Sequence, residues 1–495
     1  MNGNTFLKLN ERGLGCLADI PCLTMELFRT ELISAVKNGS RAGAFFHQDG
    51  ILYAVMISDA DHAVFVTSTA LDAGSSYPSL TPDAPAFHWF ERELFEQSSI
   101  KPEGHPWLKP IRFTGEGAEP AVTDYFTMKG DSAHEVAVGP VHAGVIEPGH
   151  FRFQCMGEDV YSLEISLGYQ HRGIEKMLTG GPRKNTLSIM ETIAGDSSTA
   201  HAGAYCMLVE ALAGLEENSA GTEVRRAIAW ELERIANHTG DLGALAGDVA
   251  FLPTQSYCGR LRGDVLNMTA HLCGNRFGRG LMVPGGVGCA ISQEHADEIL
   301  NRMKTVEEQL NDALDLMFDA PTVLDRFENT GSVSTETAAA IGVVGVAARA
   351  SSLAQDIRNT HPYGAYRTCK TPVASAVGGD VMARAEIRRQ EIRSSFALLN
   401  ELLKELPPQD SGAKLMPGKT ALRSNMIAVS LVEGWRGEIC HTAITGADGT
   451  FTRYKVVDPS FHNWFALAMA LRGEQISNFP ICNKSFNLSY CGHDL

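Results

Sequence analysis

The stretch GPVHAGVIEPGHFRF (residues 139–153) and the segment LGYQHRGIEKM (residues 167–177) decide the fold of this chain. Residues 150–155 and 160–166, at and after the end of the first stretch, have the aromatic and β-branched content that favours strands. A Pro-Gly-His loop precedes the first of these strands and carries a glutamate, Glu147. We therefore predict that a second structural region opens near Ala133, with this loop close to its start.

Downstream of the loop the sequence becomes strongly helical. Residues 223–236 (EVRRAIAWELERIA) place apolar side chains on one stripe and charges on the opposite side, the pattern of an amphipathic helix. Residues 294–317 and 380–406 are predicted to form two more long amphipathic helices. Strand-like segments return at residues 425–431, 442–445 and 451–457, before a tail rich in Cys, Asn and Ser.

Upstream of the loop, short apolar runs alternate with turn residues. Residues 42–46, 51–57 and 63–68 are predicted strands, and a helix is expected near residues 19–37. Residues 115–132 lose periodicity and gain Gly, Pro and acidic residues, as a linker does. The predicted fold class is α+β. A small α+β domain (residues 1–114) and a linker (residues 115–132) precede a mainly helical domain (residues 133–495) with peripheral strands at both ends.

Composition narrows the possible functions. The formal charge of −16 over 495 residues argues against direct binding to nucleic acid, which needs a basic face. No stretch approaches the roughly 18 uncharged apolar residues of a membrane span, and the first residues do not resemble a signal peptide, so a cytoplasmic location is expected. The eleven cysteines include no C-x-x-C pair, which argues against a zinc or iron–sulfur site bound by this chain alone.

Four segments in the right order carry a family resemblance. Residues 91–113 (ERELFEQSSIKPEGHPWLKPIRF) resemble the signature of the complex I 30-kDa subunit. Residues 139–153, leading into residues 167–177, resemble the opening of the 49-kDa subunit and of group 4 [NiFe] hydrogenase large subunits. The stretches HPYGAYRTCKTPVASAVGGDVMAR (residues 361–384) and EGWRGE (residues 433–438), the latter followed by VVDPSFHNW (residues 456–464), complete the set. The chain thus resembles a fused 30-kDa/49-kDa-like large subunit of the formate-hydrogenlyase or energy-converting-hydrogenase-related type.

The cysteines that the hydrogenases use as metal ligands are missing. A nickel–iron centre requires four soft thiolates, which that family supplies as two C-x-x-C pairs. The first pair of positions is occupied here by Ala194 and Ser197, and the second pair by Ser460 and Asn463. Residues that stay in step with the family around the first pair are Ile193, Gly195 and His201. We expect no nickel and no hydrogenase activity, and no cofactor bound by this chain alone.

The resemblance to complex I implies another use for the cavity that holds the metal in the hydrogenases. There the quinone headgroup lies between a histidine, matched here by His150, and a tyrosine, whose position is occupied by Ser197. A serine hydroxyl donates a hydrogen bond but does not yield a proton as a phenol does. A bound quinone is therefore an open alternative. Glu147 matches a proton-relaying glutamate of the hydrogenases, or caps a turn. His142 is expected to be structural.

Further polar residues match the interior of the family. Asp248 falls where complex I has an aspartate coupled to its quinone histidine, and it joins Glu147, His150 and Ser197 as a candidate for catalysis. Because buried charges are costly unless they are paired, we expect a polar network. Its predicted members are His142, Glu175, His201, Arg436 and Glu438. Whether this network conducts protons or fixes loops stays open at this point.

The resemblance implies a large subunit in the peripheral arm of a membrane-bound redox complex, on the cytoplasmic face. Its expected partners are an iron–sulfur small subunit with a [4Fe–4S] cluster, a ferredoxin-like subunit, and antiporter-like and quinone-module-like membrane subunits. Two alternatives remain: a quinone oxidoreductase subunit with unusual headgroup contacts, and a non-catalytic structural subunit whose metal site has decayed. No dinucleotide-binding spacing is present, so NAD is not expected to bind this chain.

Overall fold

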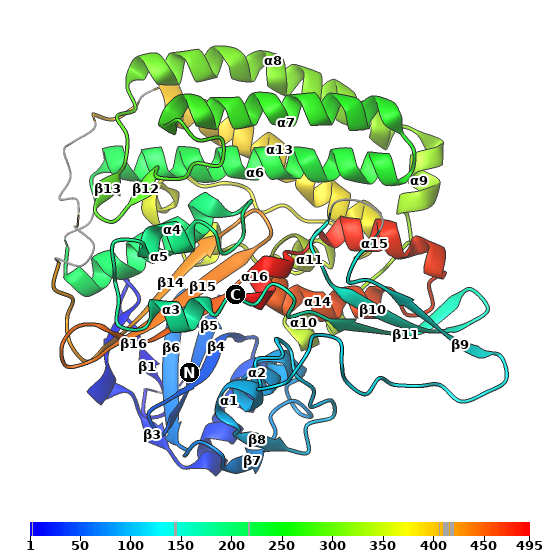
Figure 1. Cartoon of the computed structure of the whole chain (residues 1–495). Helices are drawn as coiled ribbons and strands as arrows, with labels where there is room; N and C mark the ends of the chain where they lie inside the picture. The colour runs from blue at the N-terminus through cyan, green and yellow to red at the C-terminus, as the bar shows by residue number, and fades with distance from the viewer. Residues whose placement is uncertain (2, 143–145, 216–217, 405, 409–414, 416–419) are drawn as a thin grey trace.

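The N-terminal part of the computed structural model is a mixed sheet with two helices packed on it (Figure 1). The structure describes residues 1–495 except 2, 143–145, 216–217, 405, 409–414 and 416–419. The strand order is β1-β6-β5-β4, and β3 pairs with β6 in parallel. These elements are β1 (Leu7–Lys8), β3 (Cys22–Leu23), β4 (Arg41–Gln48), β5 (Ile51–Ser58), β6 (Ala63–Ala70), α1 (Met25–Lys37) and α2 (His88–Ser98).

The first helix is shorter than the sequence suggested. Thr24 caps α1, because its side-chain oxygen accepts a hydrogen bond from the backbone N–H of Leu27 at 3.4 Å. The residues before it are used otherwise: Leu17–Asp19 form a 3-10 turn, and β3 follows. The three predicted strands of this region are all present as β4, β5 and β6.

Four long helices form a layer at the top of Figure 1. They are α6 (Ala220–Asp248), α7 (Leu252–Cys273), α8 (Gln293–Phe318) and α13 (Val381–Lys404). The charges of α6 do not lie on an open face, because Arg226, Glu231 and Arg234 are at most 1% exposed. Since α7 and α13 both pack along α6, the helix has no open face over most of its length.

A second sheet lies beneath this layer, in the order β16-β15-β14-β2. Its strands are β14 (Met426–Glu433), β15 (Glu438–Thr445), β16 (Phe451–Val457) and β2 (Leu14–Cys16), and α5 (Ser198–Ala213) packs on β14 and β15. Because β2 comes from the first residues of the chain, the N-terminal segment is built into the C-terminal sheet. The domain boundary at residue 114 remains a prediction, but the two parts are interlocked.

An antiparallel sheet in the order β11-β10-β9 projects at the right of Figure 1. It consists of β9 (Ala133–Val138), β10 (His150–Met156) and β11 (Asp159–Ser166), so the loop that carries Glu147 leads directly into β10. The C-terminal tail is helical, with α14 (Pro459–Ala470), α15 (Phe479–Phe486) and α16 (Tyr490–Asp494). Packing of α14 on β11 brings the last residues close to the Glu147 loop.

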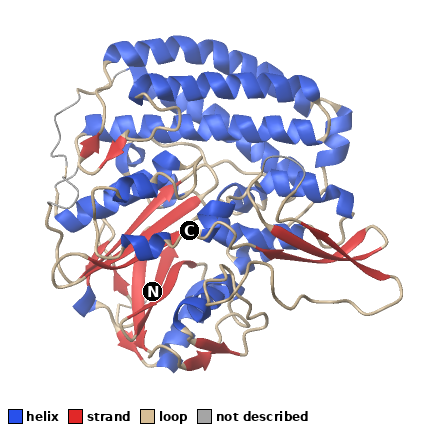
Figure 2. Ribbon diagram, viewed as in Figure 1, coloured by secondary structure: helices blue, strands red, loops and turns tan. Residues whose placement is uncertain are grey.

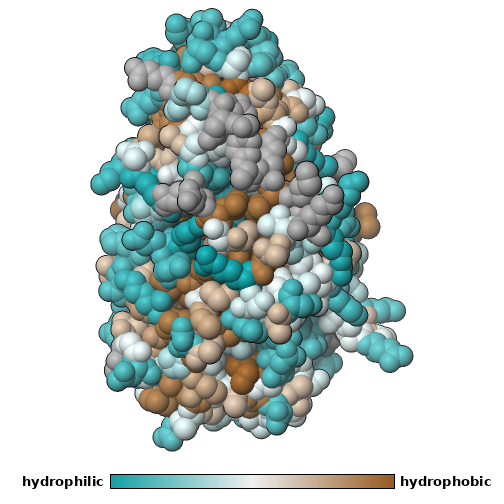
Figure 3. Space-filling model, turned by 90° about the vertical axis from the view of Figure 1, so that its left-hand side faces the viewer, coloured by the Kyte–Doolittle hydropathy of each residue, from teal (hydrophilic) through white to brown (hydrophobic). Residues whose placement is uncertain are grey.

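Shorter elements connect these parts (Figure 2). The helices are α3 (Ile174–Leu178), α4 (Thr186–Met190), α9 (Pro321–Phe327), α10 (Thr335–Ile341), α11 (Gly345–Ala350), α12 (Ile357–Thr360) and the 3-10 turn η3 (Gly364–Arg367). The strand pairs are β7 (Ser76–Pro78) with β8 (Lys101–Glu103), and β12 (Met282–Val283) with β13 (Gly286–Val287). On the face drawn in Figure 3, hydrophilic side chains cover most of the upper helical layer, and hydrophobic ones gather in patches below it. Over the residues that the structure describes, none of the helices is long and apolar enough to cross a bilayer.

Candidate functional site

The turn that leads into α5 occupies the position of the first thiolate pair. Ala194 is fully buried, and Ser197 is 3% exposed at the start of the helix. The turn is anchored by Arg436, whose Nη1 and Nη2 each donate to a carboxylate oxygen of Asp196 at 2.7 Å. Trp435 Nε1 also donates to the backbone oxygen of Asp196 at 2.9 Å. A bidentate pair of this kind fixes both position and orientation, so the β14–β15 turn holds the α5 turn in place.

Close backbone approach makes that anchor rigid. Gly345, at the start of α11, has a φ of +64°, and a Cβ at this position would lie 2.1 Å from the carbonyl oxygen of Arg436. Only glycine combines this conformation with this contact. The turn around Arg436 is therefore packed between α11 and the start of α5.

The second ligand pair lies at the start of α14, and its side chains are committed to the protein. Asp458 caps the helix by accepting from the N–H of Ser460 at 2.8 Å. The hydroxyl oxygen of Ser460 accepts from the N–H of Ser489 at 2.8 Å. Asn463 uses both ends of its amide on the backbone of Val344, at 3.0 and 3.1 Å. The side chains at these positions cap a helix and bridge loops, and they are not free to bind a metal.

A nickel–iron centre does not fit this donor set. The four ligand positions offer a methyl group, two hydroxyls and an amide, none of which replaces a bridging thiolate. Among the described residues, no cluster of three or more His, Cys, Asp or Glu side chains has a metal-binding arrangement.

Glu147 contacts the C-terminal tail next to Ser489, the residue that Ser460 contacts. Its carboxylate oxygens accept from the backbone N–H groups of Tyr490 at 3.2 Å and of Cys491 at 3.3 Å. The Cys491 sulfur lies 3.4 Å from the hydroxyl of Ser489. Burial and then the nearby charge of Glu147 raise the pKa of Cys491 to about 12, so this sulfur is a thiol at neutral pH. Sequence reasoning did not connect Cys491 with the Glu147 loop, because no local pattern joins the two.

A buried chain of hydrogen bonds runs from Asp458 into the C-terminal sheet. His201 Nε2 lies 3.1 Å from Asp458 Oδ2, and His201 Nδ1 lies 3.0 Å from His441 Nε2. His441 Nδ1 in turn lies 2.9 Å from the hydroxyl of Tyr454. Burial, and then the neighbouring His201, hold the pKa of His441 well below its usual value, so this imidazole is neutral. The arrangement has the geometry of a proton relay. His201 was predicted to belong to a network, whereas His441 was missed.

The two histidines before β10 hold loop backbone. His142 Nε2 lies 2.8 Å from the carbonyl oxygen of Gly149, in keeping with a structural role. His150 is 7% exposed, and its Nδ1 lies 3.1 Å from the carbonyl oxygen of Gly139. Its other ring nitrogen, Nε2, lies 3.3 Å from Nε of Arg152. Within the described part of the chain, no hydrogen bond links His150 to Ser197.

Two predicted network acids serve the junction with the N-terminal sheet. Glu175 pairs with Lys455 at 2.8 Å and with Arg453 at 3.3 Å. Burial alone would raise the pKa of Glu175, but the two cations, Lys455 first, have the larger effect and lower it to about 2. Glu438 pairs with Arg41 of β4 rather than with its neighbour Arg436. Both acids therefore tie the C-terminal sheet to the elements around it.

Asp248 does not contact His150, the histidine to which the resemblance to complex I couples it. Asp248 is exposed at the last residue of α6, and no ion pair or hydrogen bond joins it to His150 within the described chain. A second acid near the end of this helix, Asp241, lies two turns earlier and is 4% exposed. Asp241 accepts from Arg388 Nε at 2.8 Å and from the amide of Asn487 at 2.5 Å. Asp241 lies on the same helical stripe as Glu231 and Arg234, but a charged stripe usually faces water, so sequence reasoning missed it.

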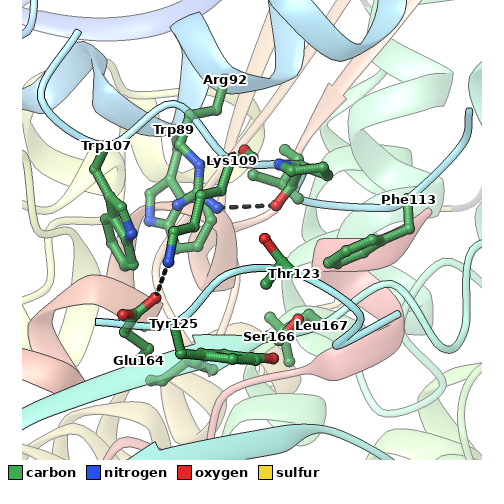
Figure 4. A pocket seen from close by; sticks show the side chains of 13 residues that line it. Trp89, Arg92, Trp107, Lys109, Phe113, Thr123, Tyr125, Glu164, Ser166 and Leu167 are labelled. Carbon is green, nitrogen blue, oxygen red and sulfur yellow. Dashed lines mark hydrogen bonds and ion pairs between the residues drawn. The ribbon is translucent and has the colours of Figure 1, made fainter. Parts of the chain in front are cut away.

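One pocket lies at the junction of α2, the linker and β11, away from the ligand positions (Figure 4). At its wall, Arg92 stacks between Trp89 and Trp107, at 4.4 and 4.6 Å from their ring centroids. In Figure 4 Lys109 points at Glu164, and their ion-pair distance is 2.6 Å. The segment that resembles the 30-kDa signature thus has a clear structural role in joining the two parts.

A second pocket borders the α5 turn. It is lined by Asp196, Thr199, Glu233, Ala236, Asn237, Leu266, Thr269, Arg276 and Phe277. The Glu233 carboxylate accepts from the N–H groups of Thr199 at 2.7 Å and Ala200 at 3.3 Å. Burial raises the pKa of Glu233 to about 8 despite these hydrogen bonds. The pocket therefore offers a carboxyl group that is mostly protonated at neutral pH, beside the degenerate ligand position Ser197.

Comparison with known proteins shows the family to which the chain belongs. Residues 248–494 match the family described as respiratory-chain NADH dehydrogenase, 49 Kd subunit, and residues 25–128 match the corresponding 30 Kd subunit. An NADH-quinone oxidoreductase subunit of Campylobacter jejuni subsp. jejuni is 32% identical over 282 residues, which are 56% of this chain and 69% of that protein. The chain belongs to the complex I 30-kDa/49-kDa family, with both parts fused in one polypeptide.

The hydrogenase side of the family is also represented. Hydrogenase-4 component G of Escherichia coli (strain K12) is 27% identical over 463 residues, which are 89% of this chain and 80% of that protein. A chain in the structure of the membrane-bound sulfane sulfur reductase, an archaeal respiratory membrane complex, has a TM-score of 0.68 at 21% identity, covering 74% of this chain and 99% of its own. The predicted α+β fold and the predicted hydrogenase-related, complex-I-like family are confirmed.

Proposed function

We propose that this chain is the large subunit in the peripheral arm of a membrane-bound, complex-I-like oxidoreductase. Its candidate site, formed by Glu147, Cys491 and the turns at Ala194 and Asp458, takes part in electron transfer without a metal of its own. Electrons reach an acceptor at this site from a [4Fe–4S] cluster in a partner small subunit. The site also couples this step to membrane subunits.

The observation that carries this proposal is the state of the four ligand positions. Ala194 is apolar, Ser460 accepts from Ser489, and Asn463 bridges to Val344. The old ligand positions have become structural parts of an ordered, buried site. Around them, Glu147, His201 and Asp458 remain as ionisable groups, which suits proton transfer coupled to electron transfer.

Relatives support the assembly around the chain. One relative is named as a component of a hydrogenase, another as a subunit of an NADH-quinone oxidoreductase, and the structural neighbour comes from a respiratory membrane complex. We propose by analogy an iron–sulfur small subunit, a ferredoxin-like subunit, and antiporter-like and quinone-module-like membrane subunits as partners. Peripheral attachment on the cytoplasmic face follows from the same analogy.

Replacing Glu147 by glutamine tests the catalytic role of the site. The variant Glu147→Gln keeps the shape of the side chain and removes the carboxylate that faces Cys491, so we expect turnover of the purified complex to fall by about 100-fold or more. The measurement is the steady-state rate of electron transfer by complexes that contain equal amounts of each subunit. Glu135→Gln, a half-exposed acid on β9, is the control and should keep full activity.

Unchanged turnover in Glu147→Gln complexes would instead identify the chain as a scaffold. Loss of assembly in this variant would show that the two carboxylate oxygens, which accept from Tyr490 and Cys491, serve the structure rather than the chemistry.

Quinone is the second candidate acceptor, favoured by the relative named as an NADH-quinone oxidoreductase subunit. The geometry weighs against the headgroup contacts of complex I, since both ring nitrogens of His150 have protein partners and Ser197 replaces the phenol. Quinone-site inhibitors should therefore leave turnover unchanged. Complete inhibition at stoichiometric concentrations would favour quinone as the acceptor.

A further inference from the structure

A cluster of charged side chains lies between α6, α11, α12, α13 and the end of β14, apart from the residues used above. Each member is at most 2% exposed. The carboxyl groups are Glu231, Asp356, Glu391 and Glu433, and the guanidinium groups are Arg234, Arg349 and Arg358. His238 contacts the cluster through Glu391, at 2.8 Å.

Ion pairs connect the members into one chain. Arg358 binds Asp356 at 2.7 Å and Glu231 at 3.1 Å. Arg234 reaches both Glu231, at 3.4 Å, and Glu391, at 3.2 Å. Because every link is buried, the cluster behaves as one electrostatic unit that water screens poorly.

Arg349 completes the chain at its far end. It joins Glu391 at 2.7 Å to Glu433 at 2.8 Å. The second carboxylate oxygen of Glu433 accepts from the backbone N–H of Ile357, at 3.1 Å. Glu433 is therefore the terminal carboxyl group, with Arg349 as its one guanidinium partner within the described chain.

The number of charges does not balance. Among the residues that the structure describes, four carboxyl groups face three guanidinium groups in this cluster, so full ionisation would leave one negative charge in excess. An uncompensated buried charge is far more costly than a neutral group. The neighbouring ion pair of Arg388 and Asp241 is balanced in itself and supplies no spare cation.

We propose that this cluster is a proton-binding site that holds one exchangeable proton on Glu433. Removal of that proton gives the interior a negative charge at the end of β14, and its return restores neutrality. The bound proton follows from the charge count and the contacts alone. Its use in coupling rests on the proposed function.

Groups on all neighbouring elements agree with this assignment. Burial raises the pKa of Glu433 to about 7, and Asp356 raises it too, while Arg349, Arg234 and Arg358 act in the opposite direction. The hydroxyl of Tyr363, from the loop before η3, accepts from the N–H of Glu433.

The other three acids stay ionised. Burial raises the pKa of Glu391, but Arg349 and His238 hold it well below its usual value. The pKa values of Glu231 and Asp356 are also lowered, in each case mainly by Arg358 against the effect of burial. Burial lowers the pKa of His238, so the imidazole does not supply the missing positive charge.

The position of Glu433 connects this proton to the candidate site. The turn that follows Glu433 carries Arg436, which holds Asp196 beside the first ligand pair. Arg234 donates to the backbone oxygen of Glu433 at 2.7 Å. The backbone N–H of Ile357 donates to the Glu433 carboxylate and so connects it to α12. A change of charge on Glu433 therefore acts on the backbone that positions both the α5 turn and the α12 segment.

Infrared difference spectroscopy on the purified full chain tests the bound proton. As the pH rises from about 5 to about 9, wild-type protein should lose the absorption of a protonated carboxyl group, with one transition near pH 7. This transition should be absent in Glu433→Gln and present in Glu401→Gln, an exposed acid on the same helix as Glu391. Glu233→Gln removes the separate transition expected near pH 8.

Stability provides the second measurement. Because the folded-state pKa of Glu433 lies above its unfolded value of 4.5, its contribution is fully present below about pH 4.5 and is lost as the pH rises towards 7. The urea midpoint of wild-type protein should thus fall relative to that of Glu433→Gln over this window. Identical infrared and urea profiles for the two proteins would overturn the proposal. Failure of Glu433→Gln to fold would also contradict it, since a neutral isostere must be tolerated there.

The bound proton on Glu433 and the proposed function of the complex can be tested independently. The proton is measured in the resting chain, without donor or acceptor, so an inactive complex does not affect the result. In the intact complex, Glu433→Gln should keep electron transfer and lose most of the proton translocation coupled to it. Full translocation in this variant would overturn the coupling role.

Discussion

Replacing Arg349 by methionine should lower the free energy of unfolding by about 3–5 kcal/mol, because one partner of a buried ion-pair chain is removed. Arg349 is fully buried and bridges Glu391 and Glu433, at 2.7 and 2.8 Å. Its loss leaves four carboxyl groups with two guanidinium groups. Urea unfolding at neutral pH measures the effect.

The control for this variant is Arg393→Met on α13. Arg393 also pairs with an acid, Asp315, but its side chain is 46% exposed, and such pairs contribute at most about 1 kcal/mol. An Arg349→Met protein as stable as the control would show that the buried cluster does not depend on its charge balance. Lowering the pH should partly rescue Arg349→Met, since protonation of the orphaned acids then costs less.

Arg436→Lys should reduce turnover of the complex by roughly 100-fold while leaving its assembly intact. Lysine keeps the charge but cannot make the two parallel hydrogen bonds that Arg436 makes to Asp196. The α5 turn would then lose its fixed orientation, and displacements of this kind are costly in an organised site. Steady-state rates of the purified complex measure the loss.

Arg453→Lys is the matched control, since Arg453 pairs with Glu175 at the domain junction and is 20% exposed. Its complex should keep most of the activity. Equal rates for Arg436→Lys and wild type would mean that the α5 turn takes no part in the reaction. A loss of subunits from the Arg436→Lys complex would show that the turn serves assembly instead.

Much of the secondary structure could be predicted because local patterns decide it. The periodic apolar residues of α8 and α13 and the turns around β4, β5 and β6 set those elements within a few residues. The start of α1 was misjudged because the strand pairing of β3 with β6, and not local propensity, decides the conformation of residues 22–23. Pairing with a distant strand leaves little trace in a single sequence.

The candidate site could be predicted only at positions that match the motifs of the family. The loss of the thiolates at Ala194, Ser197, Ser460 and Asn463 is visible in the sequence. The contact of Glu147 with Cys491 joins residues 344 positions apart, and no local pattern announces it.

Buried charge was the hardest feature to predict. A charged stripe on a helix usually faces water, and α6 follows this pattern until α7 and α13 cover it. The same limit explains Asp248, whose exposure at the end of α6 depends on where the covering helices stop, whereas Asp241 lies two turns inside. Which face is covered depends on tertiary packing, and the spacing of Glu231, Arg234, His238 and Asp241 acquires its meaning only there.

Elemental analysis of the purified intact complex, combined with an assay of dihydrogen turnover, tests the central claim most directly. We predict nickel far below one atom per copy of this chain, and no dihydrogen formation or uptake. One nickel per chain, with dihydrogen turnover that disappears when the nickel is removed, would contradict the proposal that the site works without a metal of its own.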